Sequence, residues 1–352
     1  MGKLTSVLIG CGAIAREHLN ALAHLEMVEV AAVCDISPAR AEAAAERFGI
    51  AKWCANYEKV LADVRPDLVH ITTPPSSHFP IANTCLTAGL NVLCEKPITI
   101  DYSEFCALKQ LAASKNCFFM ENQSNRFHSS IRRIQDLISS GELGELLDVQ
   151  ICISLDLFAA GSSYIDRNAP HFSFALRGGV IGDFLPHIAY LVLMFAGTVV
   201  DLRTTWTRRV TDSPLPADEF RAFIRGERAN AYVAFSGNAQ PNGFLIRLAG
   251  TKMHVEANLF EPPRLTIRRA RTGEPALATV IDGIIESRDV LRGTLSGFLR
   301  KLAGKSSYDG LRELIARTYR ALELREQQPI SLDEMDEAAR LVDRFTREDL
   351  KI

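Results

Sequence analysis

The sequence predicts an α/β fold: a doubly wound parallel sheet, followed by an α+β domain with a large, mostly antiparallel sheet. Three observations support this prediction. Short apolar strands alternate with amphipathic helices over the first third of the chain, a glycine-rich turn follows the first strand, and later segments alternate in polarity between Gly, Pro and Asn turns. We therefore predict two domains, at 1–122 and 123–352.

The first domain shows a regular succession of elements. Apolar strands are predicted at 4–9, 28–34, 68–72, 91–94 and 117–120, and helices at 16–25, 81–88 and 103–114. Ser37, Pro38 and Gly49 are residues that typically cap, begin and end a helix. Strand–helix–strand repetition implies right-handed crossovers and a parallel sheet covered on both faces.

The second domain is richer in alternating strands. A helix at 131–139 precedes a long strand at 145–157, and further strands are predicted at 202–209, 219–224, 229–235, 244–248, 253–257 and 264–269. The tail returns to helix, and Ser331 to Glu334 has the capping-box form.

Composition limits the class of protein. The chain has 352 residues, 47% of them hydrophobic, and a net charge of −2, which argues against nucleic-acid binding. It contains no apolar run of about 18 residues, so no membrane span is expected. The first residues lead directly into a strand without a signal-peptide pattern, and the eight cysteines form no CxxC pair, so we expect a cytoplasmic protein with reduced thiols.

The first strand ends in Gly10-x-Gly12-x-x-Ala15. The first glycine permits a tight turn, the second lets the backbone approach a pyrophosphate, and the small third residue lets helix and strand pack closely. Asp35 follows about 20 residues later, at the end of the second strand, where a carboxylate binds ribose hydroxyls and repels a 2′-phosphate. The pattern predicts a Rossmann domain that binds NAD, with NADP as the alternative. The predicted cofactor contacts here are Gly10, Gly12, Ala13, Ile14 and Asp35.

Two further loops follow strands of the same sheet. Thr72, Thr73, Pro74 and His78 follow one strand, and Glu95-Lys96-Pro97 follows the next. Because ligands bind at the carboxyl ends of parallel strands, we predict that these residues, Glu95 and Lys96 included, contact the cofactor. A lysine beside a positive nicotinamide ring can also share a substrate proton, so Lys96 is a catalytic candidate. The alternative is a surface Glu–Lys pair before a loop proline.

Asp183 and His187 stand four positions apart at the start of an apolar helix. They therefore share one helix face, where a carboxylate and an imidazole can bind a hydroxyl and take its proton. We predict that both are catalytic. A metal site is the rival interpretation, but no third ligand appears at useful spacing, and an Asp–His pair that only holds the helix is the other.

Together these motifs resemble those of the Gfo/Idh/MocA oxidoreductases, which include glucose–fructose oxidoreductase and inositol dehydrogenases. The resemblance rests on the glycine loop, Thr73-Pro74 with His78, Glu95-Lys96-Pro97, and Gly178-Gly179 followed by Asp183 and His187, and it covers roughly residues 4–270.

The resemblance implies an NAD(P)-dependent dehydrogenase that moves a hydride between a secondary hydroxyl of a sugar, sugar derivative or cyclic polyol and nicotinamide. It implies that Lys96 assists proton transfer, that Asp183 binds a substrate hydroxyl and that His187 is the general acid/base. It also implies a homodimer or homotetramer. Two alternatives on the same fold are a redox-neutral NAD-dependent glycosidase and a non-catalytic regulator that senses NAD or sugar.

Further substrate contacts are predicted in irregular stretches, because such loops often line sites. The candidates are Arg126, Tyr164, Arg167 and His171, with a domain-junction role as the alternative for Arg126. Residues 287–305 form a basic amphipathic pattern that suits a membrane or partner surface, or a helix packed on its own domain.

Overall fold

The computed structural model describes residues 2–162, 164, 171–260, 264–269 and 308–347, and individual residues between 280 and 299. The chain forms two compact units, which are described separately. One comprises Met1–Ser124 with Tyr308–Asp343, and the other Asn125–Ser307 with Arg344–Ile352. Arg167 and most of segment 287–305 lie outside the described residues.

The first unit contains the predicted parallel sheet. Its strands are β1 (Leu4–Ile9), β2 (Val28–Cys34), β3 (Trp53–Cys54), β4 (Leu68–Ile71), β5 (Asn91–Cys94) and β6 (Phe119–Glu121). They lie in the order β3-β2-β1-β4-β5-β6, and every neighbouring pair is parallel. The order reverses between β1 and β4, so this switch point is where a doubly wound sheet binds its ligand.

The helices of this unit largely follow the prediction. They are α1 (Ala13–Leu22), α2 (Pro38–Phe48), α3 (Tyr57–Val64), α4 (His78–Thr87), α5 (Tyr102–Lys115) and the short η1 (Pro75–Ser77). Gly49 ends α2 in the left-handed conformation, as predicted, but the Ser37 side chain makes no capping hydrogen bond. The helix α3, which the periodicity did not reveal, is capped by Asn56, whose side chain accepts from Lys59 N.

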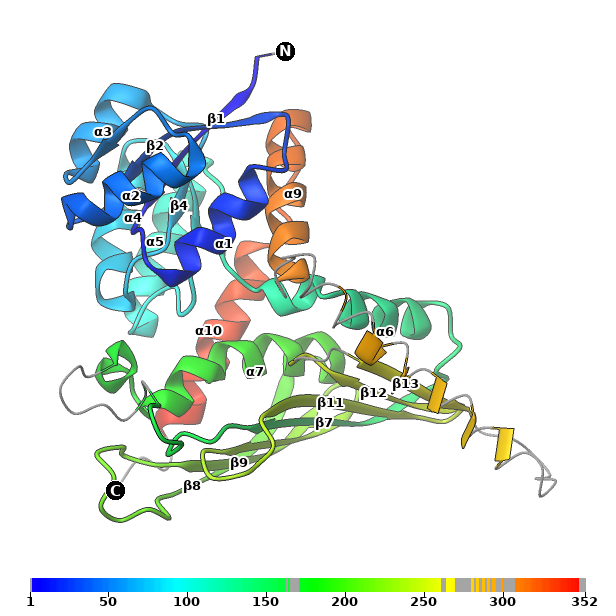
Figure 1. The fold of residues 1–352 in the computed structure, drawn as a ribbon. Coiled ribbons are helices and arrows are strands. Elements are labelled where there is room, and N and C mark those ends of the chain that lie inside the picture. The colour runs from blue at the N-terminus through cyan, green and yellow to red at the C-terminus, as the bar shows by residue number, and fades with distance from the viewer. Residues whose placement is uncertain are drawn as a thin grey trace. The chain divides into compact units, whose positions relative to one another are not determined.

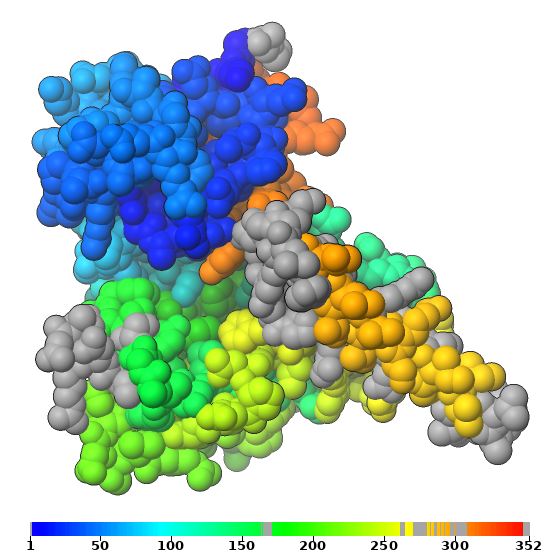
Figure 2. Space-filling view, viewed as in Figure 1, coloured from blue at the N-terminus to red at the C-terminus, as the bar shows by residue number. Residues whose placement is uncertain are grey.

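Two C-terminal helices, α9 (Asp309–Leu324) and α10 (Leu332–Arg347), belong mainly to the first unit. Figure 1 shows α9 beside α1, and in Figure 2 orange atoms of this region lie against blue atoms of the N-terminal residues. The Gln328 side chain bonds both the N–H and the C=O of Phe119, so it extends the edge at β6. The contacts thus place residues 308–343 with the first unit, which differs from the predicted range 123–352 for the second domain.

The predicted capping box at the start of α10 is confirmed. Glu334 N donates to Ser331 Oγ at 3.2 Å, and Ser331 N donates to Glu334 Oε2 at 2.9 Å. Lys109 of α5 also reaches this helix, since its Nζ lies 2.8 Å from Asp333 Oδ1 and 3.0 Å from Asp336 Oδ2. Sequence pattern shows that such helices exist, but it does not show which sheet they cover.

The second unit contains the predicted, mostly antiparallel sheet. Its strands are β7 (Leu146–Ser154), β8 (Val199–Thr207), β9 (Glu219–Gly226), β10 (Asn230–Ser236), β11 (Gly243–Gly250), β12 (Met253–Asn258) and β13 (Arg264–Arg269). They lie in the order β13-β12-β11-β7-β10-β9-β8, and β7 with β10 is the parallel pair among them. The helices are α6 (Ser129–Ser139), α7 (Val180–Ala196), η2 (Ser124–Phe127) and η3 (Phe172–Ala175).

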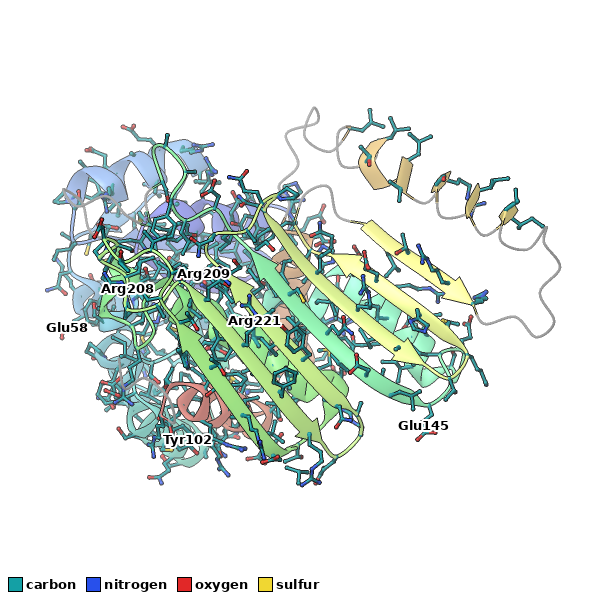
Figure 3. The ribbon with its side chains drawn as sticks, turned by 90° about the horizontal axis from the view of Figure 1, so that it is seen from below. Glu58, Tyr102, Glu145, Arg208, Arg209 and Arg221 are labelled. Carbon is teal, nitrogen blue, oxygen red and sulfur yellow. The ribbon has the colours of Figure 1, made fainter. Side chains whose placement is uncertain are left out.

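The apolar helix α7 covers one face of this sheet, packing on β7, β9 and β10. Figure 3 looks onto the opposite face, with Arg221 labelled among its side chains. No described helix is long and apolar enough to cross a membrane. The eight cysteines, all described, are unpaired.

Candidate functional site

The glycine loop is fixed at the switch point of the parallel sheet. Gly10 has φ +97°, and a Cβ there would lie 2.7 Å from backbone atoms of Thr72 and Thr73. The Thr72 hydroxyl donates to Gly10 O at 2.6 Å, so the loops after β1 and β4 are held together. The predicted cofactor residues of these two loops are therefore neighbours.

The backbone at the start of α1 has free space beside it, whereas the backbone at Gly10 is crowded. Gly12 is the N-cap, it receives no side-chain capping bond, and a Cβ placed on it would meet no protein atom within 4 Å. Ala13 is exposed and Ile14 half-buried. Exposed N–H groups at a helix N-terminus suit a pyrophosphate, so this end fits a dinucleotide.

Asp35 lies at the carboxyl end of β2, and its side chain is anchored by backbone groups. Its Oδ2 accepts from Cys11 N at 2.7 Å, and its Oδ1 accepts from Ser37 N at 2.8 Å. The residue is 7% exposed, whereas the next side chain, Ile36, is 92% exposed. A fixed carboxylate beside the glycine loop suits ribose hydroxyls, since each oxygen has a further lone pair.

Two buried polar atoms on the same edge of the sheet also fit a ligand. Within the described part of the chain, Thr73 Oγ1 and Asn122 Oδ1 have no hydrogen-bond partner. Buried polar atoms are normally satisfied, so an unsatisfied pair following β4 and β6 suits a polar group from outside the protein. The residues present thus fit a nicotinamide dinucleotide.

Glu95 is buried at the end of β5, and its carboxylate faces protein groups. Oε1 lies 2.8 Å from His18 Nε2 and accepts from Asn122 Nδ2 at 2.5 Å, while Lys96 N donates to Oε2 at 3.3 Å. Burial raises the pKa of Glu95, but the bonds from His18 and Asn122 and the charge of Lys96 outweigh it, so the pKa lies below its usual value. A direct contact of Glu95 with the cofactor stays a prediction.

His78 joins the two loops that follow β4 and β5. It begins α4, and its ring nitrogens lie 2.8 Å from Pro97 O and 2.8 Å from Thr73 O. Burial lowers the pKa of His78, although both carbonyls favour a proton on each nitrogen. The side chain therefore orients the loops. Lys96, which stands between Glu95 and Pro97 in the second of these loops, is half-buried.

In the second unit, Asp183 and His187 both lie in α7, one turn apart, as predicted. The preceding glycines are required by packing. A Cβ on Gly178 would lie 2.6 Å from the Trp206 ring, and one on Gly179 would lie 2.9 Å from Pro216. Both glycines have positive φ, so the turn brings the helix start close to these side chains.

The His187 ring is held by its own helix. Its Nδ1 lies 2.7 Å from the Tyr190 hydroxyl and 3.4 Å from Asn125 Nδ2. Tyr190 is buried, and its ring meets His187 edge-on at 5.7 Å. Tyr190 and Asn125 therefore fix the orientation of the ring.

The remaining substrate candidates lie in irregular segments of the second unit. The Tyr164 and His171 rings are 4.9 Å apart, and His171 Nδ1 lies 2.8 Å from Ser173 Oγ, where it caps η3. Arg126 is half-buried in η2. A substrate role for these three residues stays a prediction.

Sequence reasoning missed three buried groups near Glu95. They are His18, His70 and Tyr319. The sequence feature that could have revealed them is His70, a polar residue inside an otherwise apolar strand. Its partners come from helices far away in sequence, so spacing could not connect them. No described cluster of three or more His, Cys, Asp or Glu side chains could hold a metal ion.

Comparison with known proteins decides the family. The model of an oxidoreductase family with an NAD-binding Rossmann fold, GFO_IDH_MocA, matches residues 4–123, and that of the GFO/IDH/MocA C-terminal domain matches residues 131–256. The chain belongs to the Gfo/Idh/MocA oxidoreductase family. The predicted family, fold class and NAD-binding domain are therefore confirmed.

Two dehydrogenases of known substrate match part of the chain. An inositol 2-dehydrogenase from Salmonella paratyphi B is 33% identical over 42% of the chain and 44% of that protein. A D-xylose 1-dehydrogenase (NADP(+)) from Haloferax volcanii is 36% identical over 48% of the chain and 50% of that protein. The chain thus spans about half the length of these relatives.

The fold extends further than the sequence match. An oxidoreductase from Agrobacterium radiobacter, solved with NAD+, L-tartaric acid and magnesium, superposes with a TM-score of 0.77 at 17% identity. The match covers 98% of this chain and 97% of that one. At this identity the likeness shows a shared fold.

Proposed function

We propose that this family member is an NAD-dependent dehydrogenase that oxidises a secondary hydroxyl of a sugar, sugar derivative or cyclic polyol, or reduces the corresponding ketone. The observation that carries the proposal is the α7 pair, Asp183 and His187, in a chain whose other unit has the open glycine loop and anchored Asp35. Polyol and sugar dehydrogenases among the relatives support the substrate class.

The chemistry follows from the side chains. A bound nicotinamide would supply the hydride acceptor for the carbon that bears the hydroxyl. His187 takes the hydroxyl proton, while the Tyr190 hydroxyl holds its ring in place through Nδ1. Asp183 accepts a hydrogen bond from a substrate hydroxyl, and Lys96 assists the proton transfer.

The test is the absorbance of reduced nicotinamide with purified protein, NAD and single candidate substrates. Inositols, aldoses, sugar acids and nucleotide sugars are screened one class at a time. Growth of the band with one class supports the proposal and identifies the substrate. NAD binding without growth of the band in any class contradicts it, and favours the glycosidase or the sensor.

We also propose that NAD is preferred over NADP, because Asp35 holds a buried negative charge where a 2′-phosphate would lie. The variant Asp35→Asn keeps the size of the side chain, removes the charge and gives up one of the two bonds from backbone N–H groups. We expect it to shift the ratio of NAD to NADP affinity toward NADP by about 10- to 100-fold. Calorimetric titration with both dinucleotides measures this ratio.

The matched control is Glu58→Gln, which removes an exposed carboxylate from the first turn of α3. It should leave the ratio unchanged. Equal ratios for wild type and Asp35→Asn would contradict the assignment of Asp35 as the discriminating residue.

Self-association is proposed through the sheet face opposite α7 (Figure 3). Phe223 is 64% exposed there, and its ring packs at a tilt against Tyr232, with the ring centroids 5.1 Å apart. The same face carries both charge signs, in the pairs Arg221–Glu219 and Arg247–Glu256, so two copies can be self-complementary. Light scattering tests the proposal: we expect a dimer or larger that Phe223→Asp weakens, and a wild-type monomer would contradict it.

A further inference from the structure

A chain of four buried side chains runs through the first unit and ends beside Lys96. The Tyr319 hydroxyl of α9 lies 3.0 Å from His70 Nε2 on β4, and His70 Nδ1 lies 2.9 Å from His18 Nδ1 on α1. His18 Nε2 lies 2.8 Å from Glu95 Oε1. Tyr319, His70 and His18 are each 0% exposed.

The acceptor at the end of the chain fixes the direction of the last hydrogen bond. An ionised Glu95 can only accept, so His18 Nε2 donates to it. When His18 Nδ1 carries no proton, it accepts from His70 Nδ1, and His70 Nε2 then accepts from the Tyr319 hydroxyl. This arrangement needs a neutral His70, and burial together with the nearby His18 lowers the pKa of His70 well below its usual value.

Glu95 in turn supports the turn that carries Lys96. Its Oε1 also accepts from Asn122, and its Oε2 accepts from the Lys96 amide. A carboxylate held from both sides fixes the backbone where the Lys96 side chain begins. Losing the His18 donor would leave a buried charge with less compensation, and the carboxylate would protonate or move.

We propose that Tyr319, His70 and His18 are positioning residues that hold Glu95 ionised and aimed at the Lys96 amide, so that helix α9 helps to build the Lys96 site. The inference deepens the proposed dehydrogenase function and rests on it for the role of Lys96. Tyr319 and His70 are 249 residues apart, so the proposal gives the C-terminal helix a purpose beyond covering α1.

The experiment follows the backbone amide signal of Lys96 by NMR of the full chain. Labelling with 13C-glutamate and 15N-lysine selects Glu–Lys peptide bonds, of which the sequence has two, at Lys59 and Lys96. Lys59 N donates to Asn56 Oδ1 in α3 and is an internal control. The pH dependence of the Lys96 signal reports the ionisation of Glu95.

Other groups that act on Glu95 must stay constant across the variants. The charged or titratable neighbours are His18, His78, Cys94, Lys96, Glu121 and Tyr308. The variants therefore alter the chain of four and leave the remaining five neighbours in place. They are His18→Leu, His18→Gln and Tyr319→Phe, with Tyr102→Phe as the matched control.

The expected results differ between variants. His18→Leu should move the Lys96 signal and shift its pH midpoint upward by about one unit or more, whereas His18→Gln, which keeps a donor, should restore most of the shift. Tyr319→Phe keeps the ring stacked on His70 and should give a smaller shift in the same direction. Tyr102→Phe removes another hydroxyl of the first unit, which donates to Asp336, and should change neither the Lys96 signal nor the Lys59 signal.

An unchanged Lys96 signal in both His18→Leu and Tyr319→Phe would overturn the proposal, as would equal effects of His18→Leu and His18→Gln. These readouts need no substrate. If they appear as expected while no polyol is oxidised, the proposed function fails and the positioning chain stands. Once a substrate is known, Tyr319→Phe should lower kcat by about 3- to 10-fold with little change in KM.

Discussion

Replacing His187 by Asn is expected to lower kcat by about 10²- to 10⁴-fold, because the substrate hydroxyl loses the group that takes its proton. Asparagine keeps a polar side chain of similar reach, so the Tyr190 hydroxyl still finds a partner in the interior of the second unit. Affinity for NAD should stay near the wild-type value. Steady-state kinetics with the substrate found in the absorbance screen, together with calorimetric NAD titration, measures both quantities.

A second histidine of the same unit is the control for this substitution. His254 is exposed on β12, and His254→Asn should leave kcat and KM unchanged. A kcat for His187→Asn within about 3-fold of wild type would remove His187 from the proton transfer. Asp183→Asn, which retains hydrogen bonding without the charge, then separates the remaining candidates on α7.

Local sequence signals predicted the fold class well. Strand periodicity located β1, β2 and β5 at their observed residues, and the capping signals at Gly49 and Ser331 match the helix ends. These signals act over a few residues, so they do not depend on the rest of the chain. Starts of helices were less accurate: α1 begins at Ala13 and α4 at His78, three residues earlier than predicted in both cases.

Long-range packing explains what the sequence could not predict. Nothing local to α9 shows that Tyr319 reaches His70, or that His18 reaches Glu95 across 77 positions. Glu95-Lys96 was predicted as a functional pair from its place after a strand. The structure adds that the acid faces inward and supports the base, a distinction that depends on which elements surround the strand end.

The glycine loop provides the second large effect, because protein atoms crowd Gly10, whereas none lies within 4 Å of a Cβ placed on Gly12. At Gly10 the positive φ and the 2.7 Å approach to the Thr72 and Thr73 backbone leave no room for a Cβ. Gly10→Ala should therefore destabilise the fold by about 2–4 kcal/mol and weaken NAD binding with it. Urea denaturation measures the first effect and calorimetry the second.

The variant Gly12→Ala separates an effect on cofactor binding from an effect on folding stability. No protein atom lies within 4 Å of a Cβ at Gly12, and its φ of −76° suits alanine, so the free energy of unfolding should change by less than about 0.5 kcal/mol. If the pyrophosphate passes over this backbone, the added methyl group obstructs it, and NAD affinity should fall by about 10- to 100-fold. Wild-type NAD affinity in Gly12→Ala would show that the dinucleotide does not approach here. Loss of stability in Gly12→Ala would instead mean that protein atoms occupy the space at the start of α1 into which the added methyl group points.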